Sequence, residues 1–474
     1  MMIARSILGI VLLLFCKAVC AEERIQVPCA IQISSKTSDG KLTIPEILAA
    51  CRSKGIKAVI LTDRDLMQWE YGIWPLRNVI KKTVAQKSLF SYGLDRYLGE
   101  LAKIKEKNPD LIIIAGVESA AFYYWKGSVF NDDLTLGDWH KHIVAAGLRE
   151  KKDYALLPVI GNKRALALPY SVRTVYLFWP LLMIAAGVFL CRHRRMILGV
   201  ILTTIGAVFL INNYPFAHYR FDQYHGAQGA KPYQGYIDYV KNRGGLTFWV
   251  HPEACNQCRI GNVRIDTEEY PLDLYRTQDY TGFSILYEGE KKIGAIGGIW
   301  DRLLEYYCQG KRGRPVWAIA TLGFDDTGEL GDALEDLRTV VLADGFTEEA
   351  LLSALGQGSA YILAGKNSGS FVLDNFSVFD TASGKEQTMG QTLTAGRAPL
   401  VRIKGHLLRG QPGVFTIQLI KNGKVVKEFK EEAPFDIAYQ DAEEDQEKAF
   451  YRMVIEGNGI RVFTNPIFLT REQP

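Results

Sequence analysis

Two neighbouring stretches decide the fold of this chain: ISSKTSDGKLTIPEIL at residues 33–48 and AVILTDRD at residues 58–65. The first reads as a strand end, a polar loop and an amphipathic helix, and the second as a buried strand that ends in acidic residues. In barrels built from strands and helices, the loops at the carboxyl ends of the strands carry the chemistry. The two stretches therefore predict a strand–loop–helix–strand unit with a candidate site at its strand ends.

The alternation of strand-like and helix-like segments continues along the chain. A helical pattern covers 93–107, an apolar strand covers 110–118, and the same rhythm resumes over 233–253. Strands that alternate with helices predict parallel pairing in an α/β sheet or barrel. We therefore expect one α/β barrel domain, which ends near residue 368.

From residue 369 onward the pattern changes to alternating strands without helices. The segment QLIKNGKVVKEF, at 418–429, contains Asn422-Gly423, a strong signal for a two-residue hairpin turn. Strand-like segments follow to the end of the chain. This pattern predicts an antiparallel β-sandwich over 369–474.

Length and composition limit the classes of protein that the chain can belong to. At 474 residues it is too long for one ordinary hydrophobic core, so more than one domain is expected. An apolar fraction of 48% and a charged fraction of 23% are normal for a folded globular protein. The net charge of +4 is small, whereas proteins that bind nucleic acid usually carry a concentrated basic patch. Nucleic acid is therefore not an expected partner.

The N-terminus has the pattern of a secretory signal. Arg5 precedes the apolar run SILGIVLLLFC, and small residues lead to a charged segment after Ala21. This pattern predicts a signal peptide over 1–21, with an uncleaved anchor helix as the alternative. A lipoprotein cut before Cys20 is disfavoured, because Lys17 stands where an apolar residue is needed.

Two further apolar runs lie in mid-chain, at 175–191 and 196–211, and an arginine-rich turn at 192–195 joins them. Each run is close to the lower limit of about 17 residues for a membrane span. By the positive-inside rule, the turn is predicted to lie in the cytoplasm. The sequence thus predicts a two-helix transmembrane hairpin over 175–211; the alternative is a buried helical hairpin of a soluble domain.

A membrane hairpin in this position divides the barrel domain into a first part, 22–170, and a second part, 212–368. Because both of its ends lie on the same side of the membrane, both soluble domains are expected on the periplasmic side of the cytoplasmic membrane.

Five cysteines fall outside the signal and the hairpin, an odd number that leaves at least one without an intramolecular partner. Among them, CNQC at 255–258 favours a local disulfide or a structural role over a redox catalyst.

Polar residues collect at the ends of the predicted strands, in this order: Gln32, Ser34, Asp39, Asp63, Arg64, Asp65, Glu118, His142, His251 and Asp325. In the motifs TSDG, LTDRD, GVES, HKHI and VHPEA, the chain resembles the polymerase and histidinol phosphatase (PHP) family. The resemblance covers 27–65, 111–148, 244–254 and 315–328. It implies a distorted β/α barrel that holds up to three metal ions, which activate water against phosphate esters or related bonds.

The chain departs from the family pattern at four positions where a histidine is expected: Gln32, Ser34, Arg64 and Thr327. The resemblance implies that two metal positions are lost and that one ligand set is complete: Glu118, His142 and His251. Two imidazoles and a carboxylate can hold zinc, manganese or iron and leave room for water. We therefore expect one divalent metal at most, with a metal-free barrel as the alternative.

Arg64 introduces a permanent positive charge at a former ligand position, which would repel a cation there. We expect its guanidinium to pair with Asp39, or to hold a phosphate or carboxylate with two hydrogen bonds. The resemblance implies a general base at Asp325 or Asp63. His140 is expected to lie behind the ligands or at the surface.

Three functions from different classes fit these residues. The first is a membrane-anchored, exported PHP-like hydrolase with a reduced site, whose substrate is a phosphoester or a small ester or amide. The second is a non-catalytic member that binds a ligand or partner at the old site through Arg64. The third is a structural envelope protein that uses the barrel as a scaffold. A complete ligand trio spread over more than a hundred residues favours the first over the third.

Overall fold

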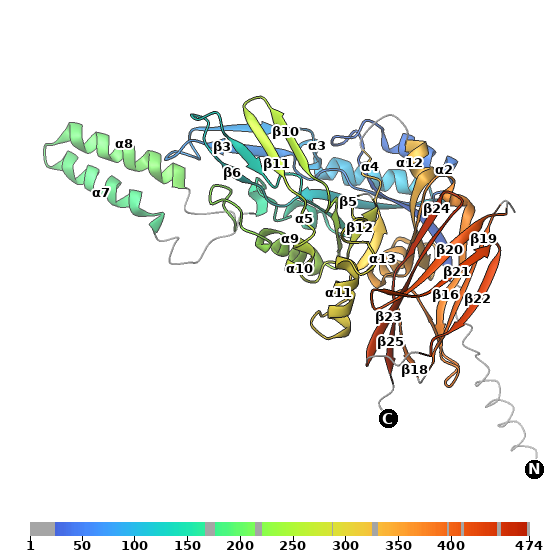
Figure 1. The fold of residues 1–474 in the computed structure, drawn as a ribbon. Coiled ribbons are helices and arrows are strands. Elements are labelled where there is room, and N and C mark those ends of the chain that lie inside the picture. The colour runs from blue at the N-terminus through green and yellow to red at the C-terminus, as the bar shows by residue number, and fades with distance from the viewer. Residues whose placement is uncertain are drawn as a thin grey trace, which may run out of the picture.

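A computed structural model describes residues 24–165, 176–213, 220–286, 288–324, 330–395, 398–408, 412–442 and 447–471. The predicted signal peptide, Asp325 and Thr327 lie outside these ranges. The described chain forms three regions (Figure 1): a mixed α/β region in the middle, a β-rich C-terminal region on one side and a projecting helical hairpin on the other. The expected α/β class and the β-rich C-terminal region are both confirmed.

Seven strands surround the core of the α/β region: β1 (Ile25–Ile33), β2 (Ala58–Leu61), β5 (Ile112–Ala120), β8 (His142–Ala146), β9 (Leu246–Val250), β12 (Gly282–Leu286) and β13 (Trp317–Ala320). Neighbouring strands pair in this order, in parallel except that β8 runs antiparallel to both of its neighbours. A parallel bridge between Ile33 and Phe324 links the chain after β13 back to β1. The strands thus form a distorted barrel with one reversed strand.

Three helices lie where the sequence predicts them: α2 (Ile44–Ser53), α4 (Leu94–Lys107) and α9 (Lys231–Lys241). Later strands are followed by α11 (Ile299–Cys308), α12 (Leu330–Asp336) and α13 (Glu348–Gln357). Helix α2 begins with a capping box between Thr43 and Glu46, which satisfies the free N–H groups of its first turn. It ends before Gly55, whose φ of 71° suits glycine. Three short helices complete this region: α3 (Leu89–Tyr92), α5 (Lys151–Ala155) and α10 (Asp273–Arg276).

Two small sheets lie outside the barrel. One is the hairpin of β3 (Gln68–Gly72) and β4 (Lys81–Ala85), and the other contains β6 (Tyr124–Lys126), β7 (Thr135–Gly137), β10 (Asn256–Ile260) and β11 (Val263–Thr267). Cys255 and Cys258 are free thiols, as are the other cysteines that the structure describes. The disulfide interpretation of CNQC is therefore not realised; Cys258 instead lies exposed on β10.

The C-terminal region packs one β-sheet against another around its own core. Its first sheet consists of β16 (Phe371–Phe379), β17 (Glu386–Thr388), β19 (Leu400–Leu407) and β22 (Phe435–Gln440). Its second consists of β18 (Thr392–Ala395), β20 (Val414–Lys421), β21 (Lys424–Glu432), β23 (Lys448–Gly457), β24 (Ile460–Thr464) and β25 (Ile467–Arg471). The predicted turn joins β20 to β21, with positive φ at Asn422 and Gly423.

The two regions share a sheet, which the sequence did not indicate. Strand β14 (Leu337–Ala343) pairs with β1 and with β15 (Ala360–Ala364), and β15 pairs with β24. Continuous backbone hydrogen bonding therefore runs from the barrel into the C-terminal region. A buried ion pair, Asp301 of α11 with Arg452 of β23, joins them a second time at 2.6 Å.

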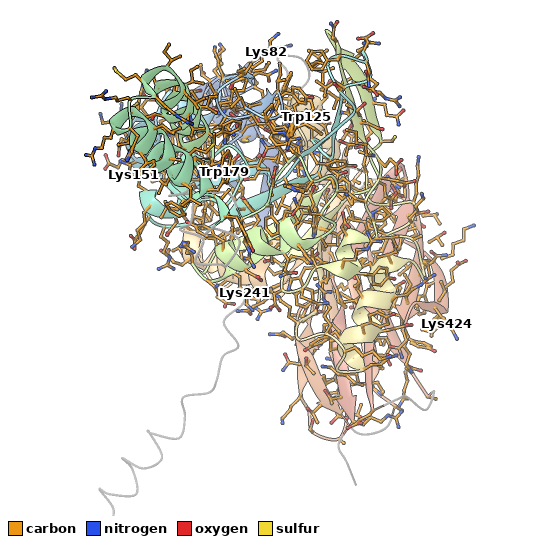
Figure 2. The ribbon with its side chains drawn as sticks, turned by 90° about the vertical axis from the view of Figure 1, so that its left-hand side faces the viewer. Lys82, Trp125, Lys151, Trp179, Lys241 and Lys424 are labelled. Carbon is orange, nitrogen blue, oxygen red and sulfur yellow. The ribbon has the colours of Figure 1, made fainter. Side chains whose placement is uncertain are left out.

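The helical hairpin projects from the α/β region (Figure 1) and consists of α7 (Trp179–Arg192) and α8 (Met196–Asn213). Figure 2 views the molecule with the hairpin toward the reader, and Lys424 marks the C-terminal region well away from it. Helix α8 has a mean hydropathy of 2.0 over 18 residues and is long and apolar enough to cross a membrane, whereas α7 is shorter. Gly187 and Gly199 bring the two helices into close contact, since a Cβ on either would overlap the other helix.

Candidate metal centre

Strand pairing brings Glu118, His142 and His251 together from three parts of the chain. Glu118 lies near the end of β5, His142 begins β8, and His251 follows directly after β9. Because β8 pairs with β5 on one side and with β9 on the other, the three side chains meet at one edge of the barrel. A bridge between Arg64 and Glu118 places the residue after Asp63 at the same edge.

The three side chains form a compact ligand set. One ligand atom from each lies within 4.8 Å of the others. His142 Nδ1 is 2.7 Å from Glu118 Oε1, and His251 Nε2 is 4.0 Å from the same oxygen. Glu118 is only 3% exposed, so its charge needs partners. The predicted trio is thus assembled in the structure.

The guanidinium of Arg64 lies inside this trio. Its Nη1 is 3.0 Å from Glu118 Oε1 and 2.9 Å from His142 Nδ1. Its Nε donates to Asp39 Oδ2 at 2.9 Å, so the predicted Asp39–Arg64 pair is present. Arg64 therefore supplies positive charge where a metal ion between the carboxylate and the imidazole would supply it.

Gln32, which stands where the family pattern has a histidine, also contacts the trio. Its Nε2 donates to Glu118 Oε2 at 3.0 Å and lies 2.8 Å from His251 Nε2. Gln32 and His251 both have a positive φ, 68° and 52°, which is uncommon outside glycine and concentrates at functional sites. No pattern in the sequence indicated this contact, because a glutamine is not a typical metal ligand.

Burial and charge set the protonation states of the trio. Burial opposes ionisation of Glu118, but the charge of Arg64 and the hydrogen bond with His142 outweigh it and hold the pKa of this carboxyl well below its usual range. Burial, followed by the charge of Arg64, lowers the pKa of His142. Burial also lowers the pKa of His251 to about 4. At neutral pH the set is thus one carboxylate and two neutral imidazoles, the forms that bind metals.

A divalent metal fits the donors of this site and conflicts with one side chain. The spacing, burial and protonation of Glu118, His142 and His251 suit zinc, manganese or iron. The Nη1 of Arg64 lies within hydrogen-bonding distance of two of these ligands. A metal would therefore need the Arg64 side chain, which is 16% exposed, to swing out of the trio first.

Asp63, predicted as a base, supports the loop between β1 and α2. Its carboxylate accepts hydrogen bonds from the backbone N–H of Ser35 at 2.8 Å and from the hydroxyl of Ser38 at 2.7 Å. Burial raises its pKa. These contacts hold the loop that carries Asp39. The base role of Asp63 stays a prediction, as does that of Asp325, which lies outside the described residues.

Two further ionisable side chains, His140 and Glu288, lie near the trio. The ring of His140 lies 5.6 Å from that of His142, and burial lowers the pKa of His140 to about 3. Glu288 Oε2 is 3.9 Å from His251 Nδ1 and is 40% exposed, so it lies on the outer side of the site. His140 thus packs behind the ligand set. Sequence reasoning missed Glu288, which follows a strand end without a motif.

A second buried acid, Asp65, belongs to a separate network. It accepts a hydrogen bond from the Ser119 hydroxyl at 2.5 Å, and Ser119 lies 2.7 Å from the hydroxyl of Tyr236. The Leu66 N–H donates to its other oxygen. Burial raises the pKa of Asp65 from 3.8 to about 7.

Replacing Asp65 by asparagine is expected to change how stability depends on pH. With a pKa raised in the folded state, Asp65 keeps its proton to higher pH in the native protein than in the unfolded chain, so its contribution to stability is lost as pH rises from 3.8 to about 7. Asparagine can donate to Ser119 and accept from Leu66 without titrating. Denaturant unfolding would be measured at several pH values. Between pH 3.8 and about 7, the free energy of unfolding of Asp65→Asn should rise relative to that of the unmodified protein by up to about 4 kcal/mol. Parallel profiles would contradict the raised pKa.

Among solved structures, three distant matches to this chain can be described. No family model and no curated protein matches the chain. A two-domain protein from Bacteroides vulgatus with a predicted PHP-like metal-dependent phosphoesterase is similar at 10% identity and a TM-score of 0.36, covering 91% of each chain. An amidohydrolase from Chromobacterium violaceum is similar at 17% identity and a TM-score of 0.28, covering 64% of this chain and 88% of that one.

A candidate metal-dependent phosphoesterase from Bifidobacterium adolescentis is similar at 12% identity and a TM-score of 0.27, covering 65% of this chain and 91% of the other. At such scores the overlap is partial, and the roles of residues in this chain rest on its own geometry.

Proposed function

We propose that this chain is an exported, membrane-anchored hydrolase of the PHP-like class that uses one divalent metal at most. The observation that supports it is the buried set of Glu118, His142 and His251, whose ligand atoms lie within 4.8 Å of one another. Zinc, manganese and iron are the candidate ions. The proposed substrate is a phosphoester, with a small ester or amide as the wider class.

The chemistry is divided between the metal and the chain's own residues. A bound metal would act as a Lewis acid on the scissile group and on water. The guanidinium of Arg64, which lies inside the trio, is also paired with Asp39. Once displaced from the trio, the guanidinium can donate hydrogen bonds to two oxygens of a phosphate group. Its ion pair with Asp39 would restrict the position of the displaced side chain. His251 and His142 are neutral at pH 7, because burial lowers the pKa of each.

We place both soluble regions on the periplasmic side of the cytoplasmic membrane, with α7 and α8 inserted as a hairpin. At ~1.5 Å per residue the 18 residues of α8 extend about 27 Å, close to the thickness of a bilayer core. Most of its apolar side chains are exposed; Ile197, for instance, is 80% exposed. The arginines of the 192–195 turn support a cytoplasmic tip.

A second candidate function is a non-catalytic barrel that binds an anionic ligand or a partner. The observation that favours it is Arg64, whose guanidinium contacts Glu118, His142 and Asp39 at once. An internal cation of this kind keeps the buried carboxylate neutralised without any metal. The two candidates therefore differ in one measurable property, the metal content of the unmodified protein.

Metal content should fall in the double variant Glu118→Ala/His251→Ala. Elemental analysis of the purified full chain is expected to find about one zinc, manganese or iron ion per chain, and the variant is expected to lose it because two of three ligands are gone. The matched control is Asp374→Ala/His406→Ala, which removes an exposed carboxylate–imidazole pair 2.8 Å apart in the C-terminal region.

Each result of this experiment has a clear meaning. A metal lost only in Glu118→Ala/His251→Ala supports the hydrolase and justifies a screen with phosphoesters. If the unmodified protein contains no metal, the proposed hydrolase is contradicted. That result favours the non-catalytic barrel, in which Arg64 neutralises the buried Glu118 carboxylate. Equal loss in both double variants would place the metal elsewhere in the chain.

A further inference from the structure

The tip of the β3–β4 hairpin is fastened to the end of α8. The Asn78 N–H donates to Asn212 Oδ1 at 3.0 Å, and Asn78 Nδ2 donates to the Asn212 carbonyl at 2.6 Å. Asn212 Nδ2 in turn donates to the carbonyl of Pro75 at 3.0 Å. Asn212 is buried although it lies on an otherwise exposed helix. Figure 1 shows the tip of this strand pair beside the end of α8.

This tip presents apolar side chains to solvent. Trp74 is 76% exposed, Val79 is 46% exposed and Ile80 is 49% exposed. The exposed Lys81 and Lys82 follow them directly on β4. Leaving a tryptophan and two branched aliphatic side chains in water is unfavourable, so an exposed patch of this kind marks a contact surface.

The position of the tip relative to α8 identifies what covers it. If α8 crosses the bilayer, Asn212 near its C-terminal end lies at one membrane boundary, because the helix is about as long as the bilayer core is thick. The neighbouring Ile211 is 67% exposed. Anything fastened to Asn212 must then lie at headgroup depth. This step rests on the membrane hairpin in the proposed function.

We infer that residues 74–80 form a second membrane contact, which rests in the lipid headgroup region beside the end of α8. Tryptophan prefers this zone because its ring is apolar and its indole N–H is polar. The ammonium group of Lys82 complements anionic headgroups, whereas that of Lys81 is paired with Glu70 at 2.8 Å. The exposed Val79 follows Asn78 and the exposed Ile211 precedes Asn212, so apolar side chains flank the hydrogen-bonded contact on both segments, which favours the bilayer over a separate protein partner.

This contact bears on the candidate metal centre through the chain itself. The segment leaves the barrel at Asp65 and returns where the Leu89 N–H donates to the Arg64 carbonyl at 2.9 Å. One short insertion therefore connects the membrane surface to the residue that lies inside the ligand trio. Holding the tip at the membrane fixes the orientation of this rim of the site toward the bilayer.

Tryptophan quenching in proteoliposomes tests the contact. The full chain would be reconstituted in vesicles of phosphatidylcholine and phosphatidylglycerol, with or without brominated acyl chains. The chain has 8 tryptophans, so the signal of one is obtained as the difference between the unmodified protein and its Trp→Phe variant. Trp74→Phe reports on the tip, Trp179→Phe on the helical hairpin, and Trp125→Phe on a buried position of the α/β region.

We expect the Trp74 and Trp179 signals to be quenched by brominated lipid and protected from aqueous acrylamide, and the Trp125 signal to be unaffected by brominated lipid. Quenching of Trp74 by acrylamide but not by brominated lipid, with Trp179 quenched by the lipid, would overturn the inference and leave the membrane hairpin intact. If neither Trp74 nor Trp179 responds to brominated lipid, both the inference and the membrane hairpin fail.

Discussion

Replacing Arg64 by alanine is expected to raise the affinity of the chain for a divalent metal by at least about 100-fold. The guanidinium Nη1 lies 3.0 Å from Glu118 Oε1, and at an effective dielectric constant near 20 such a pair interacts by about 5 kcal/mol. A metal must displace this interaction before it can use the carboxylate. Removing the guanidinium frees Glu118 and His142 at the same time.

Zinc and manganese titrations of the full chain, followed by calorimetry or by competition with a chelating dye, would measure this gain without relying on activity. Arg64→Lys serves as the control, because it keeps a positive charge near the trio and should gain much less than Arg64→Ala. An affinity that is unchanged or lower in Arg64→Ala would show that the guanidinium does not compete with metal. Arg64 would then be part of a metal-loaded site.

Replacing Arg452 by alanine is expected to lower the free energy of unfolding by about 3–5 kcal/mol. Arg452 is fully buried and bonds both oxygens of Asp301 at 2.6 Å. The variant leaves the Asp301 carboxylate buried without its counter-charge, which costs far more than the loss of an exposed pair. Because this pair joins α11 to β23, the loss should also loosen the C-terminal region from the barrel.

Arg461→Ala is the matched control for this effect. Arg461 lies on the neighbouring strand β24 and also pairs with an acid of the α/β region, Glu290, but both side chains are 38% exposed. Its loss should cost less than about 1 kcal/mol. Denaturant unfolding of the two variants under identical conditions would compare their free energies of unfolding. Equal small effects would show that water reaches Asp301 and that the buried pair does not hold the two regions together.

Local features of the fold were predictable because they depend on residues close in sequence. Thr43 and Glu46 are three residues apart, so a capping box and the start of α2 follow from the sequence. Asn422-Gly423 suffices for a hairpin turn, since both residues tolerate a positive φ. The candidate metal ligands were predicted in a different way, through the resemblance of the motifs to the PHP family.

Long-range features were not predictable in this way. The sheet shared by β15 and β24 joins residues about a hundred positions apart in the sequence, and the Asp301–Arg452 pair joins residues 151 positions apart. The reversal of β8 likewise depends on its pairing with the distant strand β9, although its other partner, β5, is close in sequence. Periodicity shows that a strand exists, but it does not show which strand lies beside it. The contact between Asn78 and Asn212 is of the same kind, because two polar asparagines carry no pairing signal.

The sequence alone determined the alternating strands and helices, the apolar hairpin and the set of residues at the strand ends. Only the tertiary structure decided how those residues are used. The side chain of Arg64 could have pointed toward solvent. Its guanidinium instead contacts two carboxylates, those of Asp39 and Glu118, and the imidazole of His142. That choice depends on the three-dimensional arrangement of charges in a buried space, where an unpaired carboxylate is costly, and no local pattern in the sequence encodes it.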